Sequence, residues 1–401
     1  MSGIIIIGAG QAGASLAEKL RSEGYDDAIT VIGAEPVPPY ERPPLSKAYL
    51  LGDSEKERLF LRPAAIYAEK DITLKLGTPV SAIDTAAKAV TVGAEVLTYD
   101  QLALTTGSDP IRLPEAIGGD LDGVFTVRTL ADIDAMSERF RQGAHVLVVG
   151  GGYIGLEAAA VASKLGLNVT LVEMAERIFG RVAAPETANV IRAAHLEHGV
   201  DIREGVGLNR LLGEGAVSGA ELTDGTTLDV DFVIAGIGIR PSTALAQSAG
   251  VSCDNGIIVD EQGRTSAPEV WAAGDCTCFP YKGSMLRLES VQNAIDQAQA
   301  VARNMIGDGV PYVPFPWFWS DQYDLKLQIA GLNTGYDQVV ARKGEAGQSH
   351  WYFKNGSFIA VDAIDAARDY MVGKRLLEMG KPITPEQAAD LGANLKALLK
   401  A

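Results

Sequence analysis

Two glycine-rich segments of the chain have the residue types and spacing of a phosphate-binding turn. They read Gly8-Ala9-Gly10-Gln11-Ala12-Gly13 and Gly150-Gly151-Gly152-Tyr153-Ile154-Gly155. In such a turn the first glycine allows a tight bend, the second lets a pyrophosphate approach the backbone, and the third lets a helix pack closely on a strand. The alternative for either segment is an ordinary turn between a strand and a helix. The pattern favours two dinucleotide sites.

A glutamate follows the last glycine of each turn by about 20 residues, the usual distance of a ribose-binding acid. These glutamates are Glu35 and Glu173. A carboxylate at a strand end accepts a hydrogen bond from a ribose 2′-hydroxyl group and repels a 2′-phosphate. Because no cation adjoins Glu173, we expect the second site to prefer NAD over NADP. Arg177 and Arg181 follow, and either could contact a pyrophosphate or only solvent.

Each glycine turn stands between a strand pattern and a helix pattern, and another strand pattern follows. The first set occupies residues 4–7, 14–20 and 28–32, and the second set occupies residues 145–149, 156–165 and 168–172. Short runs that are apolar on both faces are typical of buried parallel strands. The repeated order predicts an α/β protein with two Rossmann-like dinucleotide-binding domains.

The remaining sequence predicts a third domain. At about 150 residues per domain, a chain of 401 residues holds two to three domains. A Pro-rich segment at residues 311–316 is typical of a domain boundary. After it, Asn355-Gly356 stands between two strand patterns as a hairpin signal, and helical patterns close the chain. We expect a C-terminal α+β domain.

Composition excludes several classes of protein. Lys and Arg total 35 against 51 Asp and Glu, and the net charge of −16 argues against nucleic acid as a partner. The 3 cysteines cannot form a disulfide framework. No uncharged apolar run reaches about 18 residues, so no membrane span is expected. His195 and His198 lack a completing ligand set, and we expect no metal site. These features favour a cytoplasmic protein.

Five further segments carry a resemblance to a known family. They are Arg42-Pro43-Pro44-Leu45-Ser46-Lys47, Thr105-Thr106-Gly107, Ala272-Ala273-Gly274-Asp275, Arg287-Leu288-Glu289-Ser290-Val291-Gln292-Asn293-Ala294 and Pro316-Trp317-Phe318-Trp319-Ser320-Asp321-Gln322. Over essentially its whole length the chain resembles the NADH-dependent ferredoxin reductases of bacterial monooxygenases and dioxygenases, flavoproteins of the glutathione-reductase structural class. The resemblance implies an FAD-binding domain at residues 1–112 and 240–312, an NAD-binding domain at residues 113–239, and a C-terminal domain at residues 313–401.

The predicted cofactor contacts combine the two glycine turns with residues that the resemblance implies. The FAD contacts are Gly8, Gly10, Ala12, Gly13, Glu35, Arg42, Lys47, Val80, Arg128, Asp275, Val291 and Trp319. The NADH contacts are Gly150, Gly152, Tyr153, Ile154, Gly155, Glu173, Arg181 and Gly238. The chain departs from the family's pattern at Thr105, which replaces an alanine, and at Ser242, which replaces an asparagine.

Lys47 and Glu157 are the predicted catalytic residues. Lys47 resembles the lysine beside flavin N5, where a cation would stabilise the negative charge that arrives with a hydride. Glu157 resembles the glutamate on the nicotinamide side that can pair with this lysine. The alternatives are a surface lysine after a Pro-rich turn and a glutamate that only complements a helix dipole. For Trp317 we expect ordinary packing, the usual role of an aromatic cluster.

The resemblance implies an FAD-dependent oxidoreductase that takes a hydride from NADH and passes single electrons to a 2Fe-2S ferredoxin. The ferredoxin would supply a monooxygenase or dioxygenase, and a rubredoxin is the alternative acceptor. We expect a monomer that docks this acidic partner on a local basic patch. The candidate residues for that patch are Arg303, Lys326, Arg342 and Lys343.

Two other activities of the same fold are disfavoured. A disulfide or peroxide reductase needs a redox-active thiol against the flavin, and no cysteine precedes Cys253. Cys276 and Cys278 are expected to be small buried side chains. A signalling flavoprotein with a nucleic-acid role would need a basic surface, which the net charge of −16 opposes.

Overall fold

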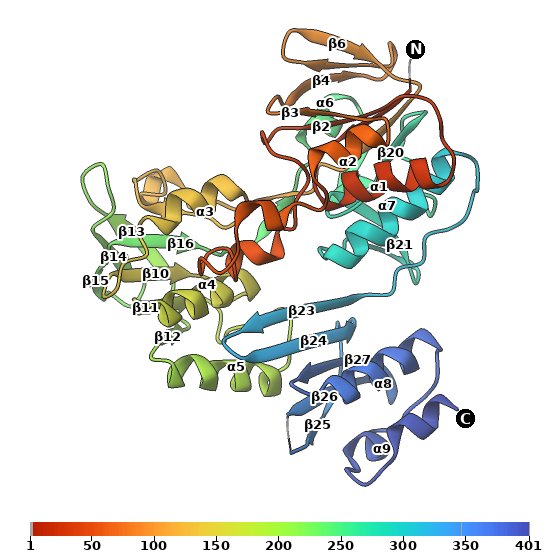
Figure 1. Ribbon diagram of the computed structural model, residues 1–401. Coiled ribbons are helices and arrows are strands. Elements are labelled where there is room, and N and C mark those ends of the chain that lie inside the picture. Colours follow the sequence, from red (N-terminus) through yellow and green to blue (C-terminus); the bar gives the residue numbers. More distant parts are fainter. Residues whose placement is uncertain (1–2, 346, 401) are drawn as a thin grey trace. The chain divides into compact units, whose positions relative to one another are not determined.

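Two structural units divide the chain in the computed structural model, which describes residues 3–345 and 347–400. The first unit comprises Met1–Arg42, Glu55–Asp109 and Ile239–Pro316, and the second comprises Pro43–Ser54, Pro110–Gly238 and Trp317–Ala401. Figure 1 traces these segments by colour along the sequence. Each unit contains one glycine turn. The division into three domains stays a prediction.

The first unit is built on a parallel sheet. Its strands pair in the order β20 (Val270–Ala272), β7 (Gln101–Leu104), β1 (Ile4–Ile7), β2 (Ile29–Gly33) and β3 (Ile72–Leu76). β1 consists of four buried isoleucines. Ile4 and Ile6 contact the core beside α1 (Gln11–Ser22) and α7 (Val291–Met305), whereas Ile5 and Ile7 contact the core on the opposite face. The strand is therefore buried on both faces, as its β-branched run predicts.

Smaller elements surround this sheet. α1 and α7 lie side by side (Figure 1). The others are the antiparallel strands β4 (Val80–Asp84), β5 (Ala89–Val92) and β6 (Glu95–Thr98), the strands β18 (Cys253–Asp254), β19 (Gly256–Ile258), β21 (Thr277–Tyr281) and β22 (Ser284–Leu286), the helices α2 (Ala64–Glu69) and α6 (Ala244–Ser248), and the 3-10 helix η2 (Lys56–Leu59). β8 (Ser108–Pro110) pairs with β17 (Ile239–Pro241).

The second unit contains another parallel sheet. Its strands pair in the order β12 (Asp201–Glu204), β11 (Asn168–Glu173), β10 (His145–Val149), β16 (Phe232–Ala235) and β9 (Val124–Phe125). The same unit contains the helices α3 (Leu130–Ser137), α4 (Tyr153–Lys164) and α5 (Pro185–Glu197). Leu147 and Val149 of β10 pack against the small sheet formed by β13 (Leu208–Leu212), β14 (Gly219–Leu222) and β15 (Thr227–Asp229). The 3-10 helices η1 (Pro43–Ser46) and η3 (Glu115–Ile117) also belong to this unit.

An antiparallel sheet occupies the C-terminal part of the second unit. Its strands pair in the order β23 (Trp317–Gln322), β24 (Leu325–Gly331), β27 (Ser357–Ile364), β26 (Gln348–Lys354) and β25 (Gln338–Lys343). The helices α8 (Ala367–Glu378) and α9 (Pro385–Ala389) and the 3-10 helix η4 (Leu395–Leu399) follow. Asn355 and Gly356 join β26 to β27 with φ angles of 49° and 72°, so the predicted hairpin is confirmed. Together the two parallel sheets and this sheet confirm the predicted fold class.

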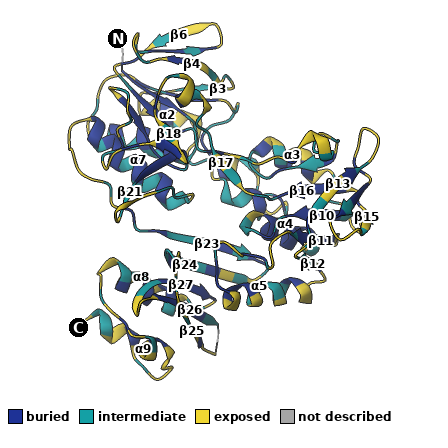
Figure 2. Cartoon of the chain, turned by 180° about the vertical axis from the view of Figure 1, so that it is seen from behind, coloured by how far each residue is buried: buried dark blue, intermediate teal, exposed yellow. Residues whose placement is uncertain are grey.

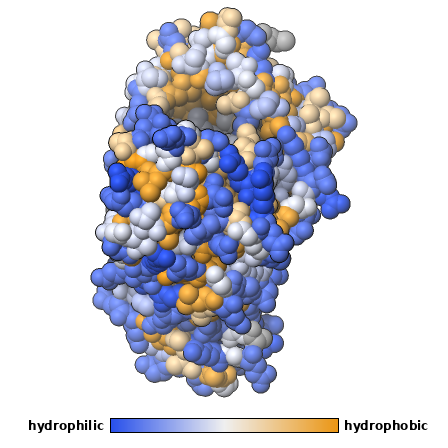
Figure 3. Space-filling model, turned by 90° about the vertical axis from the view of Figure 1, so that its left-hand side faces the viewer, coloured by the Kyte–Doolittle hydropathy of each residue, from blue (hydrophilic) through white to orange (hydrophobic). Residues whose placement is uncertain are grey.

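Burial follows the sheets of each unit. Figure 2 shows buried residues concentrated in the strands and exposed residues on the outer sides of the helices. On the face drawn in Figure 3, hydrophilic residues cover most of the surface and hydrophobic residues occur in small patches. No helix within residues 3–345 and 347–400 is long and apolar enough to cross a membrane.

Candidate dinucleotide and hydride-transfer site

The first glycine turn needs glycine at two positions and leaves open space at the third. A Cβ atom on Gly8 would lie 2.2 Å from the carbonyl oxygen of Thr105, and one on Gly13 would lie 2.0 Å from that of Gly8. Gly8 also has a φ angle of 115°, a conformation that favours glycine. No atom lies within 4 Å of a Cβ atom built on Gly10. The turn therefore packs tightly on the protein side and is open at the residue before α1.

Three chain segments converge at this turn. Gly274, which follows β20, has a φ angle of 87°, and a Cβ atom there would lie 3.0 Å from that of Ala12 and 3.9 Å from that of Ala294. Its N–H group donates to Gln297 Oε1 at 2.8 Å. The starts of α1 and α7 therefore meet beside the loop that carries Asp275. The two helix N-termini direct their unpaired N–H groups and positive dipole ends to one region, which suits an anion.

The remaining predicted FAD contacts of the first unit lie around the same sheet. Asp275 follows β20, and Ser108 Oγ donates to its Oδ2 at 3.3 Å. Val291 is the first residue of α7, whose N-cap Ser290 accepts a hydrogen bond from the N–H group of Asn293. Val80 opens β4 and packs against the core that contains Ile5 and Ile7.

Glu35 lies just beyond β2 and is held by two neighbours. Tyr40 donates its hydroxyl hydrogen to Glu35 Oε2 at 2.6 Å, and Arg42 Nη2 lies 2.7 Å from Glu35 Oε1. The guanidinium group of Arg42 also lies over the ring of Tyr40. Each carboxylate oxygen keeps a further lone pair for a ribose hydroxyl group. Glu35 and Arg42, both predicted FAD contacts, thus form one ion pair.

The second glycine turn repeats the geometry of the first. Cβ atoms on Gly150 and Gly155 would lie 2.4 Å and 2.1 Å from the carbonyl oxygens of Gly236 and Gly150. Gly150 has a φ angle of 107°. No atom lies within 4 Å of a Cβ atom built on Gly152, which caps the N-terminus of α4. Both glycine turns thus have room for a pyrophosphate at their middle glycine, and the residues present fit two dinucleotides.

Glu173 lies at the end of β11, directly beside this turn. Its Oε2 accepts a hydrogen bond from the N–H group of Gly151 at 2.7 Å, and its Oε1 accepts one from the N–H group of Ala175 at 2.8 Å. These bonds fix the carboxylate beside the turn, and its ribose-binding role stays a prediction.

The two arginines after Glu173 differ. Arg177 donates to the carbonyl oxygens of Ile178, Gly180 and Ala183, so its role is structural. Arg181 is exposed, and its Nη2 lies 3.9 Å from a Cβ atom built on Gly238, whose φ angle is 112°. The structure therefore brings Arg181 and Gly238 together, and Arg181 is the arginine available to a ligand.

Side chains of the second turn's helix face in different directions. The ring of Tyr153 packs between those of Phe179 and Phe318, with centroid distances of 4.8 Å and 4.6 Å. Ile154 is exposed. Arg128 precedes α3 and is half-buried, in the same unit as this turn.

Lys47 and Glu157 form an ion pair within the second unit. Lys47 lies just after η1, Glu157 lies on α4, and the distance from Lys47 Nζ to Glu157 Oε2 is 2.7 Å. Only 2% of the Glu157 side chain is exposed, against 20% for Lys47. Lys47 also donates to the carbonyl oxygen of Pro43 at 3.4 Å. An ammonium group has three hydrogens, and only two of those of Lys47 have a partner among the described residues. The third is available to a ligand.

Two serines complete the surroundings of Glu157, and the sequence did not predict them. Ser46 Oγ donates to Glu157 Oε2 at 2.5 Å, and Ser320 Oγ donates to Glu157 Oε1 at 2.6 Å. The buried carboxylate thus receives three donors, which satisfy both of its oxygens. The sequence carried only a partial signal: Ser320 and Gln322 alternate directly after the aromatic run Trp317–Trp319, and the structure buries both on one face of β23.

Trp317 and Trp319 share one side of β23. Their ring centroids are 5.5 Å apart, and both side chains are half-buried. The ammonium group of Lys374 lies 4.6 Å from the centroid of the Trp317 ring. The roles given to the two tryptophans stay predictions.

His195 and His198 have aromatic and amide neighbours. His195 is fully buried and bonds to Gln322 and Tyr323, and burial lowers its pKa to about 4. The His198 ring stacks on that of Tyr323 at 3.7 Å. Within residues 3–345 and 347–400 no group of three His, Cys, Asp or Glu residues could hold a metal ion.

A second buried carboxylate, Asp362, lies on β27. Thr187 of α5 donates to its Oδ2 at 2.7 Å, and Tyr352 of β26 donates to the same oxygen. His350 Nδ1 contacts Thr187 Oγ1 at 2.8 Å. Asp362 Oδ1 has no hydrogen-bond partner among the described residues. Burial raises the pKa of Asp362 to about 6 and lowers that of His350 to about 4.

The prediction that Arg342 belongs to the docking patch is wrong. Arg342 is buried, forms an ion pair with Asp369, and donates to the carbonyl oxygens of Ala388, Asp390 and Leu391. Its guanidinium group ties β25 to the segment around α9, so it is not available to a partner. Lys326 and Lys343 are exposed.

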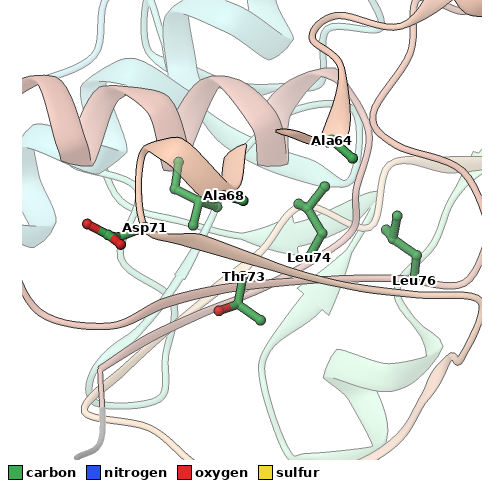
Figure 4. Close-up of a pocket in the computed structure, with 7 residues that line it drawn as sticks. Ala64, Ala68, Asp71, Thr73, Leu74 and Leu76 are labelled. Atoms are coloured by element: carbon green, nitrogen blue, oxygen red, sulfur yellow. The ribbon is translucent and has the colours of Figure 1, made fainter. Parts of the chain in front are cut away.

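Neither the three cysteines nor a hollow on the surface of the first unit adds a residue to the predicted site. Cys253, Cys276 and Cys278 are unpaired, and burial is the main cause that raises the pKa of each thiol. A hollow between α2 and β3 is lined mainly by apolar side chains, and the carboxylate of Asp71 points away from Leu74 and Leu76 (Figure 4). None of the predicted site residues lines this hollow.

Comparison with known proteins agrees with this geometry. The family "Pyridine nucleotide-disulphide oxidoreductase" matches residues 2–298, and "Reductase C-terminal" matches residues 317–399. A ferredoxin–NAD(P)(+) reductase of Sphingomonas is 43% identical over 390 residues, which are 95% of this chain and 94% of that protein. The chain belongs to the ferredoxin reductases of this family. It is an oxidoreductase that uses FAD and a nicotinamide dinucleotide.

Other ferredoxin reductases are similar over the whole length. Rhodocoxin reductase of Rhodococcus erythropolis is 41% identical over 98% of this chain and 93% of its own. The solved ferredoxin reductase of the CYP199A2 system of Rhodopseudomonas palustris is 40% identical, covers 99% of both chains and superposes with a TM-score of 0.95. The reductase in a covalent putidaredoxin reductase–putidaredoxin complex is 36% identical, with a TM-score of 0.95 over 100% of this chain and 98% of that one. These matches confirm the resemblance of the sequence to the ferredoxin reductases.

Proposed function

We propose that this ferredoxin reductase takes a hydride from NADH and passes electrons singly to a 2Fe-2S ferredoxin that supplies an oxygenase. The relatives support this proposal by their names, which include rhodocoxin reductase and the ferredoxin reductase subunit of a 5,5'-dehydrodivanillate O-demethylase. When bound, FAD supplies the chemistry that converts a two-electron donor into single-electron deliveries. The observation that carries the proposal is the pair of glycine turns, each open at its middle glycine.

In this proposal the first turn binds FAD, together with Glu35, Val80, Asp275 and Val291. The converging N-termini of α1 and α7 would place positive dipole ends near the phosphates and near negative charge on the cofactor. Arg42 would hold Glu35 in position, because the two side chains form an ion pair. Arg128 and Trp319 complete the proposed FAD contacts.

The second turn binds NADH in this proposal. Gly152 leaves room for the pyrophosphate, and Glu173 accepts from the ribose 2′-hydroxyl group while repelling a 2′-phosphate. The exposed guanidinium group of Arg181 and the open backbone at Gly238 contact the phosphates. Tyr153 and Ile154 line the turn. NADH is therefore proposed over NADPH.

Lys47 and Glu157 are proposed to assist the hydride transfer. Lys47 has one ammonium hydrogen that neither Glu157 nor Pro43 uses, and this donor would stabilise negative charge arriving beside it. Glu157 keeps the lysine oriented, because its carboxylate is buried and bonded on both oxygens. No residue has to act as a general base.

The identity of the electron acceptor, a ferredoxin or a rubredoxin, distinguishes two possible activities. A rubredoxin–NAD(+) reductase of Pseudomonas putida is 38% identical over 84% of this chain, so a rubredoxin is the alternative partner. The purified yellow protein should be assayed for cytochrome c reduction by NADH, alone and with a 2Fe-2S ferredoxin or a rubredoxin added. Stimulation by the ferredoxin is expected. Stimulation by rubredoxin alone would favour the alternative, and turnover of a disulfide without stimulation by either would overturn the proposal.

We further propose that the chain is a monomer. We also propose that it consists of three domains, of which the C-terminal one comprises residues 313–401. Size-exclusion chromatography with light scattering, with and without ferredoxin, tests the monomer.

A further inference from the structure

Glu157 is the inner end of a chain of buried hydrogen bonds that runs through β23 to α5. Gln322 Nε2 donates to Ser320 Oγ at 3.1 Å, and Gln322 Oε1 lies 2.8 Å from His195 Nε2. His195 Nδ1 lies 3.1 Å from the hydroxyl oxygen of Tyr323. Ser320, Gln322 and His195 are at most 2% exposed. All of these residues and Lys47 belong to the second unit.

The carboxylate fixes the direction of every bond in this chain. An ionised carboxylate only accepts hydrogen bonds, so the hydroxyl hydrogen of Ser320 must point to Glu157. Ser320 Oγ then accepts from the amide nitrogen of Gln322, which leaves the amide oxygen facing His195. That oxygen is also an acceptor, so the hydrogen of the neutral imidazole must be on Nε2.

The outer end of the chain agrees with this direction. With its hydrogen on Nε2, His195 must accept at Nδ1, and the Tyr323 hydroxyl group can donate there. Burial raises the pKa of Tyr323 to about 12, so the phenol keeps its hydrogen at neutral pH. Burial lowers the pKa of His195 to about 4, so the imidazole is neutral. Each donor and acceptor therefore has one role that is consistent with its neighbours.

We propose that Ser320, Gln322 and His195 are positioning residues that hold the Glu157 carboxylate, and through it Lys47, in the orientation that hydride transfer needs. The inference rests on the proposed function of the Lys47–Glu157 pair. Ser46 and Lys47 both bind Oε2, so Ser320 is the sole donor to Oε1 among the described residues. Without Ser320 the carboxylate would lose the bond that prevents its rotation.

Ser320→Ala in the holoprotein tests this inference. Rapid mixing with NADH should show a limiting rate constant of flavin reduction about tenfold lower than wild type, with the half-saturating NADH concentration nearly unchanged. Ser320→Thr, which keeps the hydroxyl group, should restore the rate. Ser349→Ala is the matched control, because Ser349 is a fully buried serine that donates to Asp369 and accepts from Trp351. It should lower stability and leave the rate unchanged.

A double-mutant cycle separates this inference from the proposed function. In a Glu157→Gln background, Ser320→Ala should cause no further loss of rate, because both residues act through one carboxylate. A wild-type rate in Ser320→Ala beside a slow Glu157→Gln overturns the positioning role alone. A wild-type rate in Glu157→Gln overturns the proposed function of the pair. If Ser320→Ala does not fold, Tyr323→Phe gives the same test at the outer end, with a smaller loss expected and an unchanged rate contradicting the inference.

Discussion

Lys47 Nζ lies 2.7 Å from Glu157 Oε2, although 110 residues separate them. The ammonium group is partly exposed and the carboxylate is buried, so the pair presents a positive charge outward and keeps its counter-ion inside. Removing one partner of a buried ion pair leaves an uncompensated charge, which costs far more than the pair itself contributes. The two residues therefore depend on each other for stability as well as for any role in catalysis.

Replacing the lysine should affect both properties. Lys47→Met should lower the free energy of unfolding by about 3 kcal/mol, because Glu157 would stay buried without a cation. It should also slow flavin reduction by NADH at least about tenfold, since the cation beside the arriving charge is lost. Denaturant titration and rapid-mixing absorbance measure the two effects. Lys164→Met, at an exposed position of α4, is the control; equal rates in both variants would exclude Lys47 from hydride transfer.

Two glycines of the first turn should respond to the same substitution in opposite ways. Gly13→Ala should prevent correct folding, because its Cβ atom would lie 2.0 Å from the carbonyl oxygen of Gly8. Gly10→Ala should fold, because no protein atom lies within 4 Å of the new Cβ atom. The new methyl group should nevertheless weaken FAD binding by about tenfold, since it occupies the space predicted for the pyrophosphate.

Circular dichroism and titration of the apoprotein with FAD distinguish the two outcomes. A well-folded Gly10→Ala protein that binds FAD with wild-type affinity would show that the open space at this turn does not receive the dinucleotide.

Glu173 should determine the choice between NADH and NADPH. Glu173→Ala removes the charge that would repel a 2′-phosphate and the acceptor for a 2′-hydroxyl group. The ratio of kcat/KM for NADH over NADPH should fall by about tenfold or more, as expected for one lost charged hydrogen bond. Steady-state kinetics with both nucleotides measures the ratio. Glu176→Ala, at an exposed position nearby, should keep the wild-type preference for NADH. An unchanged preference in Glu173→Ala as well would show that Glu173 does not determine the choice of nucleotide.

Asp362 should give the protein a distinctive pH dependence of stability. Its pKa is about 6 in the folded protein and about 4 when unfolded. The folded state therefore binds this proton more tightly, so protonation of Asp362 stabilises the fold as pH falls from about 6 to about 4. His195 and His350 act in the opposite direction, because their lowered pKa values make the folded state resist protonation below about pH 6.5.

Comparing wild type with Asp362→Asn isolates the carboxyl group, since both proteins share the histidines. Between pH 7 and pH 4 the wild type should gain about 2 kcal/mol in unfolding free energy relative to the variant. Urea denaturation at several pH values measures this difference. Asp324→Asn, at an exposed position, should run parallel to wild type. A constant difference between wild type and Asp362→Asn would show that Asp362 does not titrate in this range.

The sequence predicts the parallel sheets well, because their signals are local. β1 and β10 have the predicted bounds, since each is a short apolar run that stops at a glycine needing a positive φ angle. The hairpin at Asn355 and Gly356 is predicted for the same reason. Tight turns restrict the backbone to a few residue types, and those types are visible without any knowledge of the tertiary structure.

The surroundings of Glu157 could not be predicted in this way. Ser320 is 163 residues away in the sequence, and its contact depends on how β23 packs against α4. The error at Arg342 has the same origin. A lone arginine in a strand pattern is usually exposed, but here carbonyl groups around α9 surround it, and only the tertiary structure supplies them.

Three separate stretches of chain supply the environment of Glu157, namely the segment Pro43–Ser54, the helix α4 and the strand β23. This arrangement limits how chimaeras between ferredoxin reductases can be made. A chimaera that takes residues 317–401 from a relative without a hydroxyl group at position 320 would inherit a buried oxygen with no donor. Recombination at this boundary should therefore succeed only between chains that carry both the acid and the serine.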